Sequence, residues 1–170
     1  QVVTSADAFR HADALAIAPY IGMNVPGDQA DEVVKLGLDG ILDKVERESL
    51  PRAIEDMQKQ KALADEYNLQ LIAYEGGQHL VGVQGGENNQ ELEQLLHAAN
   101  KHPRMGDFYR RYYKAWEDSG GGLHCAFSSV SRWSKWGSWG LMQYYDEAPA
   151  DYPKFQATLD WMKKQHGTKR

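Results

Sequence analysis

The apolar residues of this chain form short continuous runs that alternate with longer stretches of helical spacing. The runs over 14–20 and 69–75 have the length and apolarity of strands buried on both faces, as in parallel sheets. Pro19 interrupts the first run, because proline cannot donate to a strand ladder. Gly76 and Gly77 stop the second run and turn the backbone. Residues 123–127 predict a third strand, and 141–145 predict a short extended segment.

Helices are predicted between these strands. After a loop over 21–29, helical spacing predicts one helix capped by Asp28 and a second capped by Ser49. Two more helices precede the third strand, and a last one covers 151–166. Helical connections of this length between strands indicate a parallel α/β fold. Because no repeat or low-complexity linker divides the chain, we expect one domain over residues 1–170.

Composition excludes several kinds of partner and cofactor. The net charge of −5 argues against nucleic acid, and no segment approaches the roughly 20 apolar residues of a membrane span. The chain has no glycine-rich phosphate motif and no H-E-x-x-H, so we expect no cofactor and no metal. The single cysteine, Cys125, is expected to be an inert core thiol. A start at Gln1 without a signal peptide is typical of a mature product, an excised domain or a fragment.

Glu75 is the first candidate for chemistry, because it stands at the carboxyl end of the second predicted strand. Open α/β sheets and α/β barrels place reacting groups at these ends. A buried glutamate is also costly unless its charge is used. The alternative is a glutamate that pairs with a cation or caps amides at the glycine turn. His79 is a candidate for hydrogen bonding to Glu75 or to a ligand, and His124 is either a pocket residue or a core histidine.

Aromatic residues gather at the same predicted sheet edge. Tyr20 and Tyr74 stand at the ends of the first two strands, and the loop after the third strand carries Trp133, Trp136 and Trp139. Sugar rings pack their C–H faces on aromatic planes, and a carboxylate suits an oxocarbenium-like transition state. These residues therefore predict a saccharide site, with Trp133 favoured for stacking because it is nearest the strand end. Their alternative role is to fill the core or an interface.

Three blocks carry a family resemblance: 14–20, 73–80 and 133–140. With the AYEGGQH and SKWGSWG segments, they resemble the C-terminal half of a bacterial (β/α)₈ glycoside hydrolase of the large retaining clan that includes cellulases. The resemblance implies a half-barrel of about four parallel strands with helices packed on its outer face. In that clan the nucleophile is a glutamate at the end of the seventh strand, and an aromatic residue often follows the eighth. Glu75 matches the nucleophile position.

One part of the family pattern is missing from this sequence. The clan's acid/base glutamate is on the fourth strand, a position that would precede Gln1. Retaining hydrolysis needs two carboxyl groups about 5–5.5 Å apart. Within the chain the second could come from a loop residue, Asp28, Glu87 or Asp146, each of which is otherwise a solvated or capping residue. A homodimer of half-barrels would alternatively close the sheet and bury its free edges.

Three functions are compatible with these patterns. The first is a glycoside hydrolase that acts on a β-linked glucan such as cellulose; its partner would be an oligo- or polysaccharide, and its location secreted or periplasmic. The second is a non-catalytic carbohydrate-binding or degenerate barrel fragment that uses the tryptophan platform. The third is a structural module whose aromatic residues form an interface.

Overall fold

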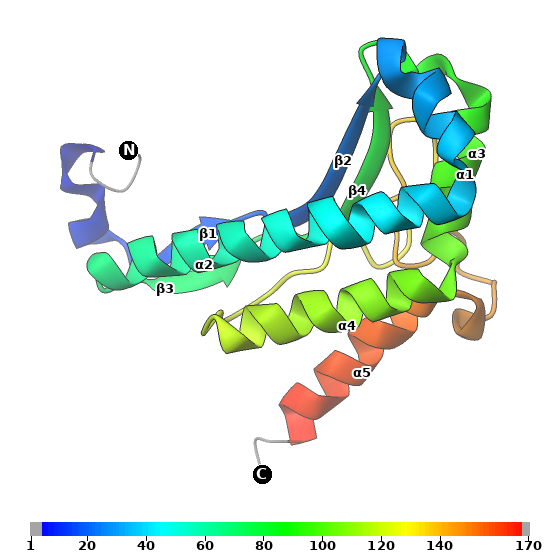
Figure 1. Cartoon of the computed structure of the whole chain (residues 1–170). Helices are drawn as coiled ribbons and strands as arrows, with labels where there is room; N and C mark the ends of the chain where they lie inside the picture. The colour runs from blue at the N-terminus through cyan, green and yellow to red at the C-terminus, as the bar shows by residue number, and fades with distance from the viewer. Residues whose placement is uncertain (1–4, 168–170) are drawn as a thin grey trace.

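Two parallel pairs of strands form the sheet framework of this computed structural model, which describes residues 5–167. Strand β1 pairs with β3, and β2 pairs with β4 (Figure 1). Only two residues separate β1 from β2, and only three separate β3 from β4. The two pairs therefore form one parallel ladder that is interrupted by a short gap. The strands are β1 (Ala14–Ile17), β2 (Tyr20–Pro26), β3 (Gln70–Ala73) and β4 (Gly77–Val83).

The predicted third strand is present only in part. His124 forms a single parallel bridge with Ala73. The amides of Cys125 and Phe127 extend this contact by donating to the carbonyls of Ala73 and Gly76. The three extended segments therefore lie side by side in chain order and parallel, and the α/β prediction is confirmed at this level. The extended segment predicted at 141–145 is likewise reduced to a bridge at Met142.

The two predicted strand ends, after Tyr20 and at Gly76-Gly77, are wrong, because both extended segments pair again after the gap. Gly77 does not turn the chain away but begins β4, with a φ of 141° that places it against the hydroxyl of Tyr109. The loop predicted over 21–29 is mostly β2. Its last residues, 27–29, form a short 3₁₀ turn, and the Asp28 side chain makes no cap.

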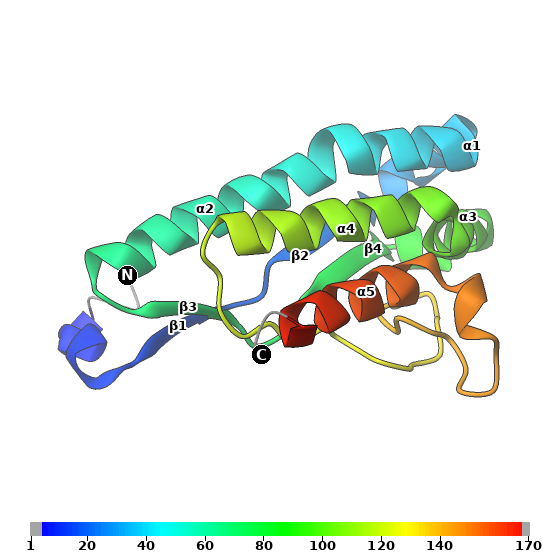
Figure 2. The same ribbon diagram turned by 90° about the horizontal axis from the view of Figure 1, so that it is seen from below.

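Helices connect the strands and cover one face of the sheet (Figure 2). Helices α1 and α2 follow β2, α3 and α4 follow β4, and α5 ends the described chain. A π-helical turn, Val45–Ser49, joins α1 to α2 without a break, so Ser49 is inside a helix and caps nothing. Such turns accommodate proline inside a helix, here Pro51. The helices are α1 (Ala30–Lys44), α2 (Leu50–Glu66), α3 (Gln90–Lys101), α4 (Pro103–Asp118) and α5 (Pro153–Gly167).

The core lies between the helices and one face of the strands. Leu71 and Ala73 of β3 are buried on this face, together with the aromatic side of α4. The opposite face of the β1–β3 pair and of the neighbouring 123–127 segment is uncovered in the described chain. Its side chains include Leu123 at 67 % exposure, Tyr74 at 60 % and Phe127 at 41 %. Parallel sheets are normally covered on both faces, so this one-sided arrangement is incomplete as a sheet.

The β2–β4 pair is held tightly at its far end, which can be tested by substituting glycines. A Cβ on Gly82 would lie 2.3 Å from the backbone carbon of Gly86, whereas a Cβ on Gly22 meets nothing within 4 Å. We expect Gly82→Ala to lower the free energy of unfolding by about 3 kcal/mol, because backbone must move. Gly22→Ala, in the partner strand, should change it by less than about 1 kcal/mol. Urea denaturation measures both, and equal effects would contradict the packing described.

Candidate functional site

Glu75 lies in the gap of the ladder. The gap comprises Ala18-Pro19, between β1 and β2, and residues 74–76, between β3 and β4. Pro19 has no amide hydrogen, so the pairing cannot run through this level. The amide of Tyr74 makes the last bond before the gap, donating to the Ile17 carbonyl at 3.1 Å. Glu75 is consequently half-buried between two ladders instead of standing at a strand end.

A single hydroxyl fixes the backbone on both sides of this gap. The buried Tyr112 of α4 donates to the Pro19 carbonyl at 2.7 Å, and its oxygen lies 2.8 Å from His124 Nε2. Since the tyrosine proton is used on Pro19, His124 must donate from Nε2. A Cβ on Gly76 would lie 2.6 Å from the same hydroxyl, so glycine is required beside Glu75. The gap is therefore held from within the core.

The carboxylate of Glu75 lies near the hydroxyl of Tyr20. Burial, followed by the charge of Glu75, raises the pKa of this phenol above its ordinary value. The phenol therefore stays protonated beside the carboxylate.

Three aromatic rings continue the site from Tyr20. The ring of His79 lies 6.0 Å from Tyr20 and is stacked on Trp139, with centroids 4.8 Å apart and planes at 27°. Phe127 also packs edge-on against Trp139, with ring centroids 6.0 Å apart. Burial lowers the pKa of His79, which favours its neutral form. Glu75 is thus the charged group beside a neutral aromatic wall.

The tryptophan loop (residues 128–142) explains which tryptophan reaches this wall. The amides of Leu141 and Met142 donate to the carbonyls of Ser128 and Ser129, which folds the loop back on its own base. Trp139, late in the loop, returns to the strand end and stacks on His79. Distance along the sequence from the strand end is therefore a poor guide to position in a closed loop.

Other predicted site residues lie outside the aromatic wall. Trp133, favoured for stacking, is 4 % exposed and packs edge-on against Tyr152, so its face is not free for a ligand. Trp136 is 60 % exposed with Lys135 over its ring, and it lines an open groove together with His79. Tyr74 is exposed and lines the open groove between β1 and α2 together with Tyr20.

His124 belongs to the aromatic core. Its ring packs edge-on against the rings of Tyr113, Trp116 and Trp161 in addition to its bond with Tyr112. The expectation of a core thiol at Cys125 is wrong, because the cysteine is exposed. Side chains alternate along an extended segment, so Cys125 points away from the core that His124 enters. Phe127, which the sequence reasoning missed, is two residues further on the same outer face.

The candidate second carboxylates do not gather around Glu75. Asp28 and Glu87 follow the far ends of β2 and β4, which are seven-residue strands. At the usual rise per residue, these ends are on the order of 20 Å from the gap. Asp146 is exposed beyond the tryptophan loop. Of the four carboxylates named from the sequence, only Glu75 lies near Tyr20, although Asp56 of α2 also lines the open grooves that Tyr20 borders.

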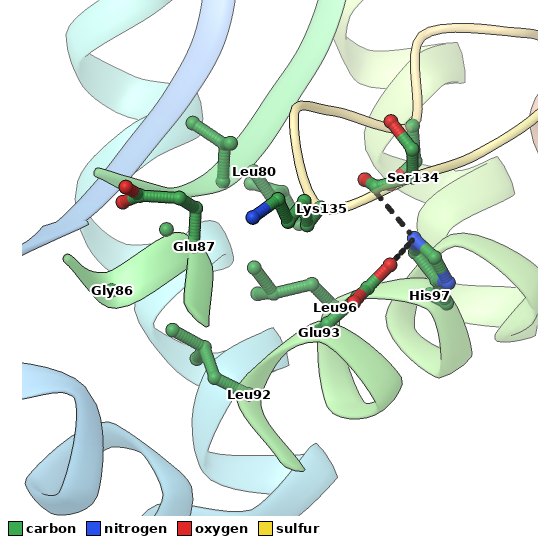
Figure 3. Close-up of a pocket in the computed structure, with 12 residues that line it drawn as sticks. Leu80, Gly86, Glu87, Leu92, Glu93, Leu96, His97, Ser134 and Lys135 are labelled. Atoms are coloured by element: carbon green, nitrogen blue, oxygen red, sulfur yellow. Dashed lines mark hydrogen bonds and ion pairs between the residues drawn. The ribbon is translucent and has the colours of Figure 1, made fainter. Parts of the chain in front are cut away.

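The tip of the tryptophan loop docks on α3 around a small cavity (Figure 3). His97 Nε2 lies 3.4 Å from the Ser134 carbonyl oxygen and 3.9 Å from Glu93. Lys135 reaches the side-chain oxygen of Asn88 at 2.9 Å. The cavity has a volume of about 10 Å³, room for at most one water molecule. This place is therefore an anchor of the loop and not a ligand pocket.

The described side chains include no cluster of three or more His, Cys, Asp or Glu residues placed to hold a metal ion. No helix within residues 5–167 has the length and apolarity needed to cross a membrane. Comparison of the chain with models of protein families, with curated proteins and with solved structures found no match.

The core position of His124 predicts a pH dependence of stability. Burial lowers its pKa to about 4, from an ordinary 6.5, and Nδ1 has no hydrogen-bond partner. Between these values the unfolded chain binds a proton that the folded protein does not, so stability falls as the pH drops below 6.5. From pH 8 to pH 5, this histidine should cost about 2 kcal/mol.

Urea denaturation of wild type and His124→Gln at both pH values isolates this effect. Glutamine can still donate to Tyr112 but has no titrating group. The variant should therefore lose less stability on acidification than wild type does. An identical loss in the two proteins would contradict the burial of a neutral His124.

Proposed function

We propose that this chain is a glycoside hydrolase-like protein that acts on a β-linked glucan, with Glu75 as its nucleophile or key carboxylate. The observation that carries the proposal is the contact of Glu75 with Tyr20 beside the aromatic wall of His79 and Trp139. Apolar ring faces suit the C–H faces of a sugar, and an oriented carboxylate suits attack at an anomeric carbon.

The half-barrel is part of the same proposal. Support comes from the parallel order of β1, β3 and the 123–127 segment, with helical connections packed on one face. This is the local arrangement of successive units in a (β/α)₈ barrel. The uncovered face would then correspond to the barrel interior, and the gap that holds Glu75 to its active end.

The geometry suggests how Tyr20 would serve the reaction. Its protonated hydroxyl lies near Glu75 and would donate to one carboxylate oxygen, which would orient the group. The other oxygen would attack the anomeric carbon, and the neutral His79 and Trp139 would hold the sugar without competing for the positive charge of the transition state. Protonation of the leaving group needs a second carboxyl group from outside this cluster.

Glu75→Gln tests the catalytic role. An amide cannot form the glycosyl ester, so we expect reducing-sugar release from a soluble β-glucan to fall at least about 100-fold. Glu91→Gln, an exposed glutamate of α3, is the matched control and should keep wild-type activity. Equal activity of Glu75→Gln and wild type would overturn the role of Glu75.

A non-catalytic carbohydrate-binding protein is the second candidate, favoured by the distance of Asp28 and Glu87 from the gap. It predicts that cello-oligosaccharides change the tryptophan fluorescence of wild type and of Glu75→Gln while neither protein releases sugar. Absence of both binding and hydrolysis would contradict both candidates and favour an interface role for the aromatic residues.

We further propose that a second copy of the chain covers the free edge of β1 and the uncovered face. The edge borders an open groove of about 750 Å³ between β1 and α2, and three large apolar side chains are exposed on the face. Burial of such a surface stabilises association, as it stabilises folding. Closure of this kind would also remove the unpaired backbone groups of the edge.

Light scattering should then give twice the mass of one chain. Leu123→Glu, which places a charge on the uncovered face, should shift the protein towards the monomer, because a buried unpaired charge is costly. Leu36→Glu is the control, since Leu36 is 48 % exposed on α1, away from this face. A wild-type monomer at all concentrations tested would overturn the dimer.

A further inference from the structure

A fully buried lysine contacts the tryptophan loop. Lys154, in the first turn of α5, is 0 % exposed. Its Nζ lies 2.7 Å from the side-chain oxygen of Asn100 and 2.6 Å from the Ser138 carbonyl, and it lies 4.8 Å from the centre of the Trp133 ring. Burial lowers the pKa of this amine well below its ordinary value. A neutral amine has two N–H groups, and these match the two oxygen acceptors.

The Ser138 carbonyl is where this lysine meets the candidate site. It accepts a second buried hydrogen bond, from the side-chain amide of Gln78. Gln78 precedes His79 in β4, and Ser138 precedes Trp139 in the loop. The hydrogen bond between Gln78 and the Ser138 carbonyl therefore links the two neighbours of the stacked rings of His79 and Trp139.

The remaining contacts of the loop tip are weaker. The Lys135–Asn88 bond is exposed, and exposed polar contacts contribute little to stability. The His97–Ser134 contact is long, at 3.4 Å. Buried donors that lose their acceptor, or acceptors that lose their donor, carry a much larger penalty. Lys154 and Gln78 are therefore the contacts that hold this part of the loop against β4.

We propose that Lys154 is a positioning residue, which holds Ser138 so that Trp139 stays stacked on His79 at the candidate site. Lys154 touches neither Glu75 nor the ring wall in this arrangement and acts through the loop backbone. Its consequence for sugar binding rests on the proposed function, whereas its effect on the loop does not.

Lys154→Met tests the proposal, because methionine fills a similar volume but donates no hydrogen bond. Thr158→Val is the matched control, since Thr158 is also buried on α5 and its hydroxyl bonds Lys154 O and Tyr113 instead of the loop. Hydrogen exchange followed by mass spectrometry, on peptides covering 128–142, is the direct measurement. We expect exchange at least tenfold faster in Lys154→Met than in wild type, and wild-type exchange in Thr158→Val.

The milder Lys154→Gln, which keeps an amide donor, replaces Lys154→Met if the latter does not fold and should give an intermediate rate. Unchanged exchange over 128–142 in the folded lysine variant would overturn the proposal, and so would equal acceleration in Thr158→Val. A titration with cello-oligosaccharides then separates the two ideas. If Lys154→Met exchanges faster and binds sugar severalfold more weakly than wild type, both ideas are supported. If Lys154→Met exchanges faster but wild type itself binds no sugar, the positioning role is supported and the saccharide site is removed.

Discussion

The hydroxyl of Tyr112 holds three backbone segments at one level of the fold. It donates to Pro19, lies against Gly76 and meets His124 on the third segment. The bond to Pro19 satisfies a carbonyl that the gap in the ladder would otherwise leave unpaired in the core. The position of Glu75 depends on this arrangement, since Glu75 is adjacent to Gly76 and the nearby Tyr20 is adjacent to Pro19. The core side of the sheet thus determines the geometry of the opposite side.

The same division between faces explains the protonation states around the site. His124 and Lys154 lie on the core side, where burial lowers the pKa of both and favours their neutral forms. Beside Glu75, burial raises the pKa of the Tyr20 phenol, because it disfavours the charged phenolate, so Tyr20 stays protonated. The phenol of Tyr20 and the imidazole of His79, which lie on the Glu75 side, are therefore both neutral.

Sequence patterns predicted the parallel α/β class and the helical connections, because apolar runs and helical spacing are local signals. They placed Glu75 at a strand end and did not predict that the ladder resumes at Gly77. Two glycines ordinarily indicate a turn, and only the tyrosine hydroxyls of a distant helix show that these glycines make room for contact. The choice of Trp133 over Trp139 failed for a related reason. Loop closure through Leu141 and Met142 is a long-range backbone contact that no spacing of tryptophans encodes.

The uncovered face connects the question of catalysis with that of assembly. Retaining hydrolysis needs a second carboxyl about 5–5.5 Å from the first, while Asp28 and Glu87 follow strand ends that point away from the gap. Tyr20 lines two open grooves beside α2, and Asp56 of α2 lines both of them. No hydrogen bond or ion pair among the described residues joins Asp56 to Glu75, so the second carboxyl group would have to come from whatever covers the free edge and the bare face. Whatever covers the face would therefore also determine whether Glu75 acts as a nucleophile or only as a ligand for sugar.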